Sequence, residues 1–134
     1  MKTVIKSIVV MSMLALVFTS CKKEDGEGEL KISFKSGATY TSEDKALLAG
    51  TVVTIGVEAE TEKAKDPIIR FNISESVDGA AASTVYTENL ETTDYQHDYT
   101  FTLDSISGTQ HKFTFTVTNR DGFNAQKSLT VSVQ

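Results

Sequence analysis

Cys21 is the only cysteine of the 134-residue chain, and its surroundings indicate one kind of chemistry. It follows an apolar segment and precedes the polar stretch 22–29, which holds no apolar residue. A lone cysteine in an exported chain is a lipid attachment site, a free thiol or an intermolecular bridge, because it cannot form an intramolecular disulfide. We predict the first of these, with cleavage between Ser20 and Cys21 followed by lipidation of Cys21.

Four tyrosines are the candidates for ligand binding, since sugars stack on exposed aromatic rings. They are Tyr40, Tyr86, Tyr95 and Tyr99. The alternative for Tyr95 and Tyr99 is a place in the core or at its rim, with the hydroxyl group in water. The chain has no Trp, which lowers the expectation of carbohydrate binding.

His97 and His111 are the only histidines, and both fall on the apolar phase of strands that we expect to be neighbours. They could approach each other and bind a metal with Asp98 or Asp104. No ligand spacing supports this arrangement, and structural zinc sites need four ligands. We therefore predict structural histidines, no metal site and no cofactor.

The sequence carries no recognisable catalytic motif. It lacks a nucleophile elbow, a glycine-rich phosphate loop and a zincin motif. Carboxylate pairs such as Glu43 and Asp44 lie in apparent loops, whereas a glycosidase pair needs a cleft. The remaining acids match no calcium-binding EF-hand loop. We predict that the chain is not an enzyme.

The first 20 residues have the pattern of a secretory signal peptide. Lys2 and Lys6 precede an apolar run, Ile8–Phe18, that only Ser12 interrupts. This run is too short for a transmembrane helix, which needs about 20 residues, and it fits the apolar region of a signal peptide. A core helix would show polar residues at a spacing of 3.6, and this run does not. A retained anchor or a core helix is the alternative.

Segment 18–21, Phe-Thr-Ser-Cys, resembles the lipobox of bacterial lipoproteins, in which a dedicated peptidase cuts directly before the cysteine. Phe18 replaces the usual Leu. Ordinary cleavage after Ser20 would need a small residue at position 18, so Phe18 disfavours that rival. The resemblance implies several acyl chains on Cys21, and two or more chains hold a protein stably in a membrane.

The polar stretch 22–29 is predicted to be a flexible tether. Its first four residues, Lys-Lys-Glu-Asp, resemble the surface-export signal of Bacteroidetes lipoproteins. Eight extended residues reach about 26–29 Å, so the domain would lie close to the lipid. The resemblance implies an outer-membrane lipoprotein that faces the cell exterior; retention on the periplasmic face is the alternative.

The charge balance limits the classes of partner that the chain can bind. Subtracting Lys2 and Lys6 from 13 basic residues leaves 11, against 18 acidic ones, so the mature chain has a formal charge of −7. An acidic surface argues against nucleic acid, because phosphate binding needs a basic face. It also argues against electrostatic attachment to anionic lipid. The lipid on Cys21 is therefore the expected membrane contact.

From residue 30 onward, apolar and polar residues alternate as in half-buried strands. The segments are 30–35, 51–60, 68–74, 95–103, 111–118 and 128–133, with a further strand after a hairpin loop at 78–82. Segment 46–50 fits a short strand or one helical turn, and 88–93 is expected to be a turn. Gly56 lies on a polar face, where a missing side chain costs little packing. Seven or eight strands predict an antiparallel β-sandwich; a small closed barrel is the alternative.

Segments 113–122 and 128–133 resemble the last hairpin of immunoglobulin-like modules in bacterial surface proteins. The turn between them contains Asp121-Gly122, which supplies the positive φ of a tight turn. His111 occupies the place where such folds often have the tyrosine of a tyrosine corner. The whole chain resembles a small Bacteroidetes surface lipoprotein: a signal peptide at 1–20, a lipidated cysteine and tether at 21–29, and an immunoglobulin-like sandwich at 30–134.

From these features we predict a non-enzymatic, lipid-anchored domain for binding or adhesion at the cell surface, or for an accessory role, with a protein partner. The first alternative is a glycan-binding accessory lipoprotein of a polysaccharide-utilisation system, whose N-terminal domains are often immunoglobulin-like. The second alternative is a structural spacer.

Overall fold

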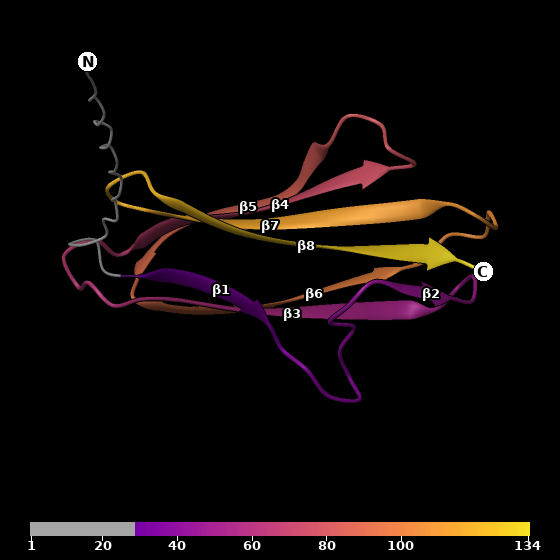
Figure 1. The fold of residues 1–134 in the computed structure, drawn as a ribbon, viewed down its shortest axis with the longest axis horizontal. Coiled ribbons are helices and arrows are strands. Elements are labelled where there is room, and N and C mark those ends of the chain that lie inside the picture. The colour runs from indigo at the N-terminus through magenta and orange to yellow at the C-terminus, as the bar shows by residue number, and fades with distance from the viewer. Residues whose placement is uncertain (1–28) are drawn as a thin grey trace, which may run out of the picture.

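The computed structural model describes residues 29–134, and the predicted signal peptide, Cys21 and residues 22–28 of the tether lie outside them. Eight strands, with no helix among the described residues, form two sheets packed face to face (Figure 1). The strands are β1 (Leu30–Phe34), β2 (Lys45–Leu47), β3 (Val52–Thr61), β4 (Ile68–Val77), β5 (Ser83–Thr92), β6 (Asp94–Thr102), β7 (Gln110–Asn119) and β8 (Asn124–Val133).

Sheet A has the order β1-β3-β6, and sheet B has the order β2-β8-β7-β4-β5. Every pair is antiparallel except β2 with β8. This arrangement confirms the predicted all-β immunoglobulin-like sandwich with eight strands, rather than a closed barrel. Residues 29–134 contain no helix of the length and apolarity that a membrane span requires.

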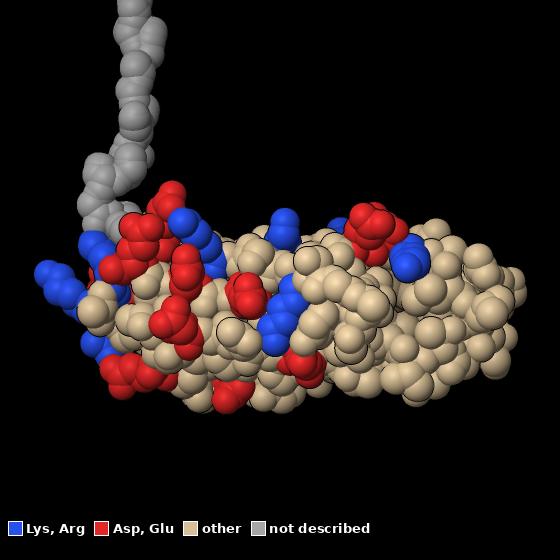
Figure 2. Space-filling view, turned by 90° about the horizontal axis from the view of Figure 1, so that it is seen from below, with Lys and Arg blue, Asp and Glu red and all other residues tan. Residues whose placement is uncertain are grey.

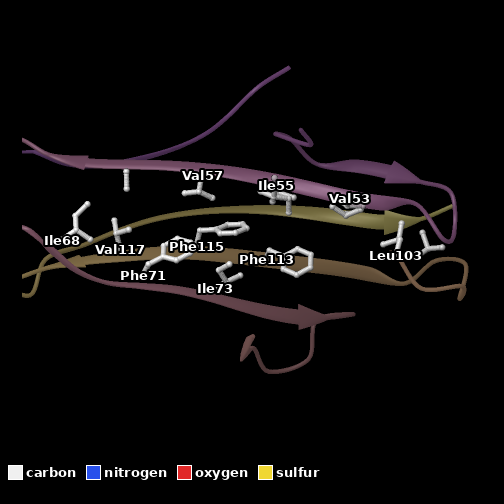
Figure 3. Packing of buried hydrophobic residues seen from close by; sticks show 14 residues of the cluster. Val53, Ile55, Val57, Ile68, Phe71, Ile73, Leu103, Phe113, Phe115 and Val117 are labelled. Carbon is white, nitrogen blue, oxygen red and sulfur yellow. The ribbon is translucent and has the colours of Figure 1, made fainter. Parts of the chain in front are cut away.

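The core is built from the side chains that alternate inward on both sheets (Figure 3). β3, β4 and β7 each supply three fully buried apolar residues: Val53, Ile55, Val57; Ile68, Phe71, Ile73; and Phe113, Phe115, Val117. Leu103, Leu129 and Val131 extend it along the sandwich. The alternation that was read from the sequence therefore corresponds to the inner faces of the two sheets.

Two tight turns follow the predicted chemistry. Asp78 and Gly79 both have positive φ, 52° and 80°, and the Ala80 N–H donates to the Val77 carbonyl over 3.0 Å. This is a type I′ turn, whose twist matches that of the strands it joins. At the last hairpin Gly122 has a φ of 92°, as the Asp-Gly pair predicted.

The prediction of a turn at 88–93 is wrong. Residues 83–92 form strand β5, and only Thr93 separates it from β6. The polar residue Glu88 in this strand faces inward, where the hydroxyl groups of Tyr86 and Tyr95 donate hydrogen bonds to it. Two register shifts interrupt the pairing of β5 with β4, one between Thr84 and Tyr86 and one between Asn89 and Thr92.

Gly56 is a close-packing position, and the prediction that its missing side chain costs little packing is wrong. A Cβ atom there would lie 2.6 Å from Cε1 of Tyr40 and 2.7 Å from Cδ of Lys35. Both side chains cross the outer face of sheet A to reach Asp98, which pairs with Gly56. The absence of a side chain at Gly56 therefore makes room for the Tyr40 ring.

Gly56→Ala should lower the free energy of unfolding by about 1–3 kcal/mol, because the added methyl group displaces Tyr40. Urea denaturation measures this change. The control is the same substitution in a Tyr40→Ala chain, where the ring is absent and only the flexible Lys35 side chain has to shift. There the cost should vanish, since Ala is favoured over Gly within a strand by roughly 0.5–1 kcal/mol. An equal loss of unfolding free energy in both backgrounds would contradict the proposed packing of Tyr40 on Gly56.

Candidate functional site

The four predicted tyrosines occupy three different places. Tyr40 lies on the outer face of sheet A, where its hydroxyl group donates to Asp98 over 3.2 Å. Tyr99 is half-buried against Phe113, with ring centroids 5.6 Å apart. Tyr86 and Tyr95 come from different sheets and meet between them. Only this last pair is brought together.

Glu88 is the centre of that meeting point. Its Oε1 accepts hydrogen bonds from the hydroxyl groups of Tyr95, over 2.5 Å, and Tyr86, over 2.9 Å. These two donors hold the pKa of Glu88 below its usual range. Burial, and then the bond to Glu88, raise the pKa of Tyr95 well above its usual range. The carboxylate thus stays ionised and links β5 to β6 across the edge of the sandwich.

Aromatic rings support this cluster from inside. The fully buried ring of Phe71 lies 5.0 Å from the Tyr95 ring and 5.2 Å from the His97 ring, centroid to centroid. The His97 ring packs against the Tyr86 ring at a tilt of 34°, with centroids 4.5 Å apart, and burial lowers the pKa of His97. The Tyr95 hydroxyl group also lies 3.3 Å from Nδ1 of His97. The ring of Tyr95 is therefore confined on several sides.

The expectation that His97 and His111 lie on neighbouring strands is wrong. β6 with His97 belongs to sheet A, whereas β7 with His111 belongs to sheet B. His111 has its own partners: Nδ1 lies 2.7 Å from Glu75, and Nε2 lies 3.0 Å from Asp104. These carboxylates face opposite sides of the imidazole ring, so they do not converge on one point. Within residues 29–134 no three His, Cys, Asp or Glu side chains are grouped to hold a metal ion.

A groove of about 770 Å³ lies between the sheets at the end where β1, β6 and β8 begin. Its cause is a pair of small residues. One cross-strand row of sheet A consists of Ile32, Ala59 and Tyr95. The small side chain of Ala59 therefore leaves space between two larger side chains. Ala125 of β8 lines the same groove from sheet B. Leu30 completes its apolar lining.

Charged residues at the groove belong to its rim. Glu58, Glu60 and Asp94 contribute to the lining, but they alternate with the inward residues and are exposed on the outer face of sheet A. Figure 2 shows acidic side chains gathered toward this end of that face. Lys31, also at the rim, pairs with Glu29 over 3.2 Å. The lining of the groove is thus mixed, with about as much polar as apolar surface; its apolar part comes from Leu30, Ile32, Ala59 and Ala125, with Tyr95 as the aromatic residue.

Sequence reasoning missed three residues of this site. Glu88 falls two residues from Tyr86 and two from Leu90, a spacing that places all three on one face of a strand. That spacing was the available signal, and the polar neighbours of Glu88 obscured it. Ala59 and Ala125 appeared as ordinary inward residues, because nothing in a single strand shows that two alanines from different sheets line one groove.

No protein-family model and no curated protein sequence matches the chain. Its fold is similar to that of superoxide reductase (neelaredoxin) from Ignicoccus hospitalis. One structure has a TM-score of 0.56 at 9% identity, covering 81% of this chain and 83% of the other. A second has a TM-score of 0.53 at 11% identity, covering 78% and 80%. A CARDB domain from Pyrococcus furiosus has a TM-score of 0.43 at 12% identity, covering 80% and 96%.

These comparisons contradict the predicted function. The prediction was a non-enzymatic domain for binding, adhesion or an accessory role, and its alternatives were glycan binding and a structural spacer. A similar sandwich occurs in superoxide reductases, which are enzymes, so the immunoglobulin-like shape does not indicate an adhesion module. At 9–11% identity the likeness shows the fold alone and carries no activity to this chain. The predicted cleavage and lipidation sites, Ser20 and Cys21, lie outside the described residues.

Proposed function

We propose that this chain is an outer-membrane lipoprotein whose sandwich binds a small apolar ligand, such as an acyl chain, in the groove between its sheets. The lipobox-like segment 18–21 and the acidic stretch after it support the anchor on Cys21 and a position facing the cell exterior. The single observation that carries the ligand class is the groove of about 770 Å³ that Ala59 and Ala125 help to line.

The size of the groove and the apolar side chains that point into it favour a small molecule with an apolar chain. Ligand pockets in proteins commonly have volumes of about 300–1,000 Å³ and mostly apolar walls. Leu30, Ile32 and the ring of Tyr95 provide such walls here. A ligand methylene group that moves from water into this space gains about 0.8 kcal/mol. Carboxylates on the outer rim would repel an anionic head group, so a neutral ligand is favoured.

Binding can be tested with a series of linear alcohols from hexanol to dodecanol. Every described contact lies within residues 29–134, so a soluble 22–134 fragment retains the whole sandwich. We expect saturable binding that perturbs the methyl NMR signals of Leu30, Ile32 and Ala125. Affinity should rise about fourfold for each added methylene group until the groove is full. The absence of saturable binding throughout the series would overturn the proposal.

Ala125→Leu should fill the groove and weaken binding of the best alcohol about tenfold or more, because the new side chain occupies the ligand's space. Ala125 is only half-buried, so the sandwich should still fold. Ala81→Leu is the matched control, since Ala81 is exposed in the β4–β5 turn away from the groove. Equal affinities for the two variants would show that the alcohols bind elsewhere.

A further inference from the structure

We propose that Tyr95, held in place by Glu88, limits the length of the ligand that the groove accepts; this inference rests on the proposed function. Tyr95 is the specificity-determining residue, because its ring lines the groove. Glu88 does not line the groove and acts through Tyr95, so it is a positioning residue.

The place of Tyr95 follows from the strand order. Sheet A runs β1-β3-β6, and the row Ile32–Ala59–Tyr95 crosses all three strands. Ala59, the smallest side chain of this row, forms the floor of the groove. A chain that lies over Ala59 and extends toward β6 therefore meets the Tyr95 ring. Beyond that ring lies the edge where β5 faces β6, occupied by Glu88 and Tyr86.

The ring of Tyr95 is held as a fixed wall. Its hydroxyl group donates to Oε1 of Glu88 over 2.5 Å, and Tyr86 donates to the same oxygen over 2.9 Å. His97 lies parallel to the ring at 6.2 Å, with an interplanar angle of 9°. Phe71 packs against it from the core at 5.0 Å. A hydrogen bond to an ionised acceptor is stronger than one between neutral groups, so Glu88 is the strongest single restraint.

Tyr95→Val tests the length limit. The variant removes the wall and keeps a residue that is favoured in strands. In the 22–134 fragment the affinity should level off at one alcohol length, whereas in Tyr95→Val it should keep rising about fourfold per further methylene group. Tyr99→Val is the matched control: it removes a half-buried ring from the same face of β6 outside the groove, and the length limit should not change. An unchanged limit in Tyr95→Val would overturn the assignment.

Glu88→Gln tests the positioning role without a ligand. Gln keeps the shape of the side chain and removes its charge, so the Tyr95 ring should flip about tenfold faster in NMR relaxation experiments. An unchanged flip rate would overturn the role of Glu88. If the parent fragment binds no alcohol, the proposed function and the length limit both fail. If it binds alcohols and Tyr95→Val keeps the same limit, only the length limit fails.

Discussion

Phe71→Ala should lower the free energy of unfolding by about 3–5 kcal/mol, one of the two largest effects that we expect. Phe71 is fully buried, and four aromatic rings surround it. Their centroids lie 5.0 Å (Tyr95), 5.2 Å (His97), 6.1 Å (Tyr86) and 6.4 Å (Phe115) from that of Phe71. These rings come from β5, β6 and β7, so no single strand can move to fill the cavity. Urea denaturation with tyrosine fluorescence measures the change.

Phe123→Ala is the matched control, because it removes the same side chain from a position that is 51% exposed. Its effect should stay within about 0.5 kcal/mol, as for most surface substitutions. Phe71→Leu should fall between the two, since Leu fills part of the cavity. A loss below 1 kcal/mol for Phe71→Ala would mean that the two sheets close over the missing ring, contrary to the packing in Figure 3.

The proposed lipid anchor predicts that the full chain incorporates labelled palmitate and fractionates with the outer membrane, and that Cys21→Ser abolishes both. A serine has no thiol to carry the lipid, and the acidic mature chain has no electrostatic attraction to anionic lipid. Membrane fractionation and metabolic labelling measure the two effects. This change concerns where the protein lies, and the free energy of unfolding of the sandwich should be unaffected.

Ser20→Ala is the matched control for this experiment. It keeps a small residue directly before Cys21, so processing, labelling and localisation should remain as in the parent chain. A Cys21→Ser chain that is still cut after Ser20 and still fractionates with the outer membrane would contradict the lipid anchor.

Most of the fold could be predicted because each strand carries its own signal. In β3, the residues Val53, Ile55 and Val57 alternate with polar neighbours or glycine, and a period of two is enough to assign a strand and its buried face. The turn at Asp78-Gly79 was predictable for a similar reason, since its backbone conformation depends on two adjacent residues. These are local properties, and a single segment displays them.

The site could not be predicted, because its signals belong to pairs of segments. Glu88 faces inward where it accepts hydrogen bonds from Tyr86 of its own strand and from Tyr95 of the opposite sheet, and the second donor cannot be seen in the sequence of β5. The groove is lined by small residues of both sheets, Ala59 of β3 and Ala125 of β8. His97 and His111 were expected to be neighbours because their strands follow each other in the chain, but the segment between β6 and β7 crosses from one sheet to the other.

The two register shifts in β5 bear on how copies of this protein behave when they are crowded. β5 is an edge strand of ten residues, and a long regular edge is a template for pairing with an identical chain. The shifts, near Val85 and between Asn89 and Thr92, place bulges in that edge and break its regular row of donors and acceptors. Crowded molecules are thereby protected from joining their sheets into larger aggregates.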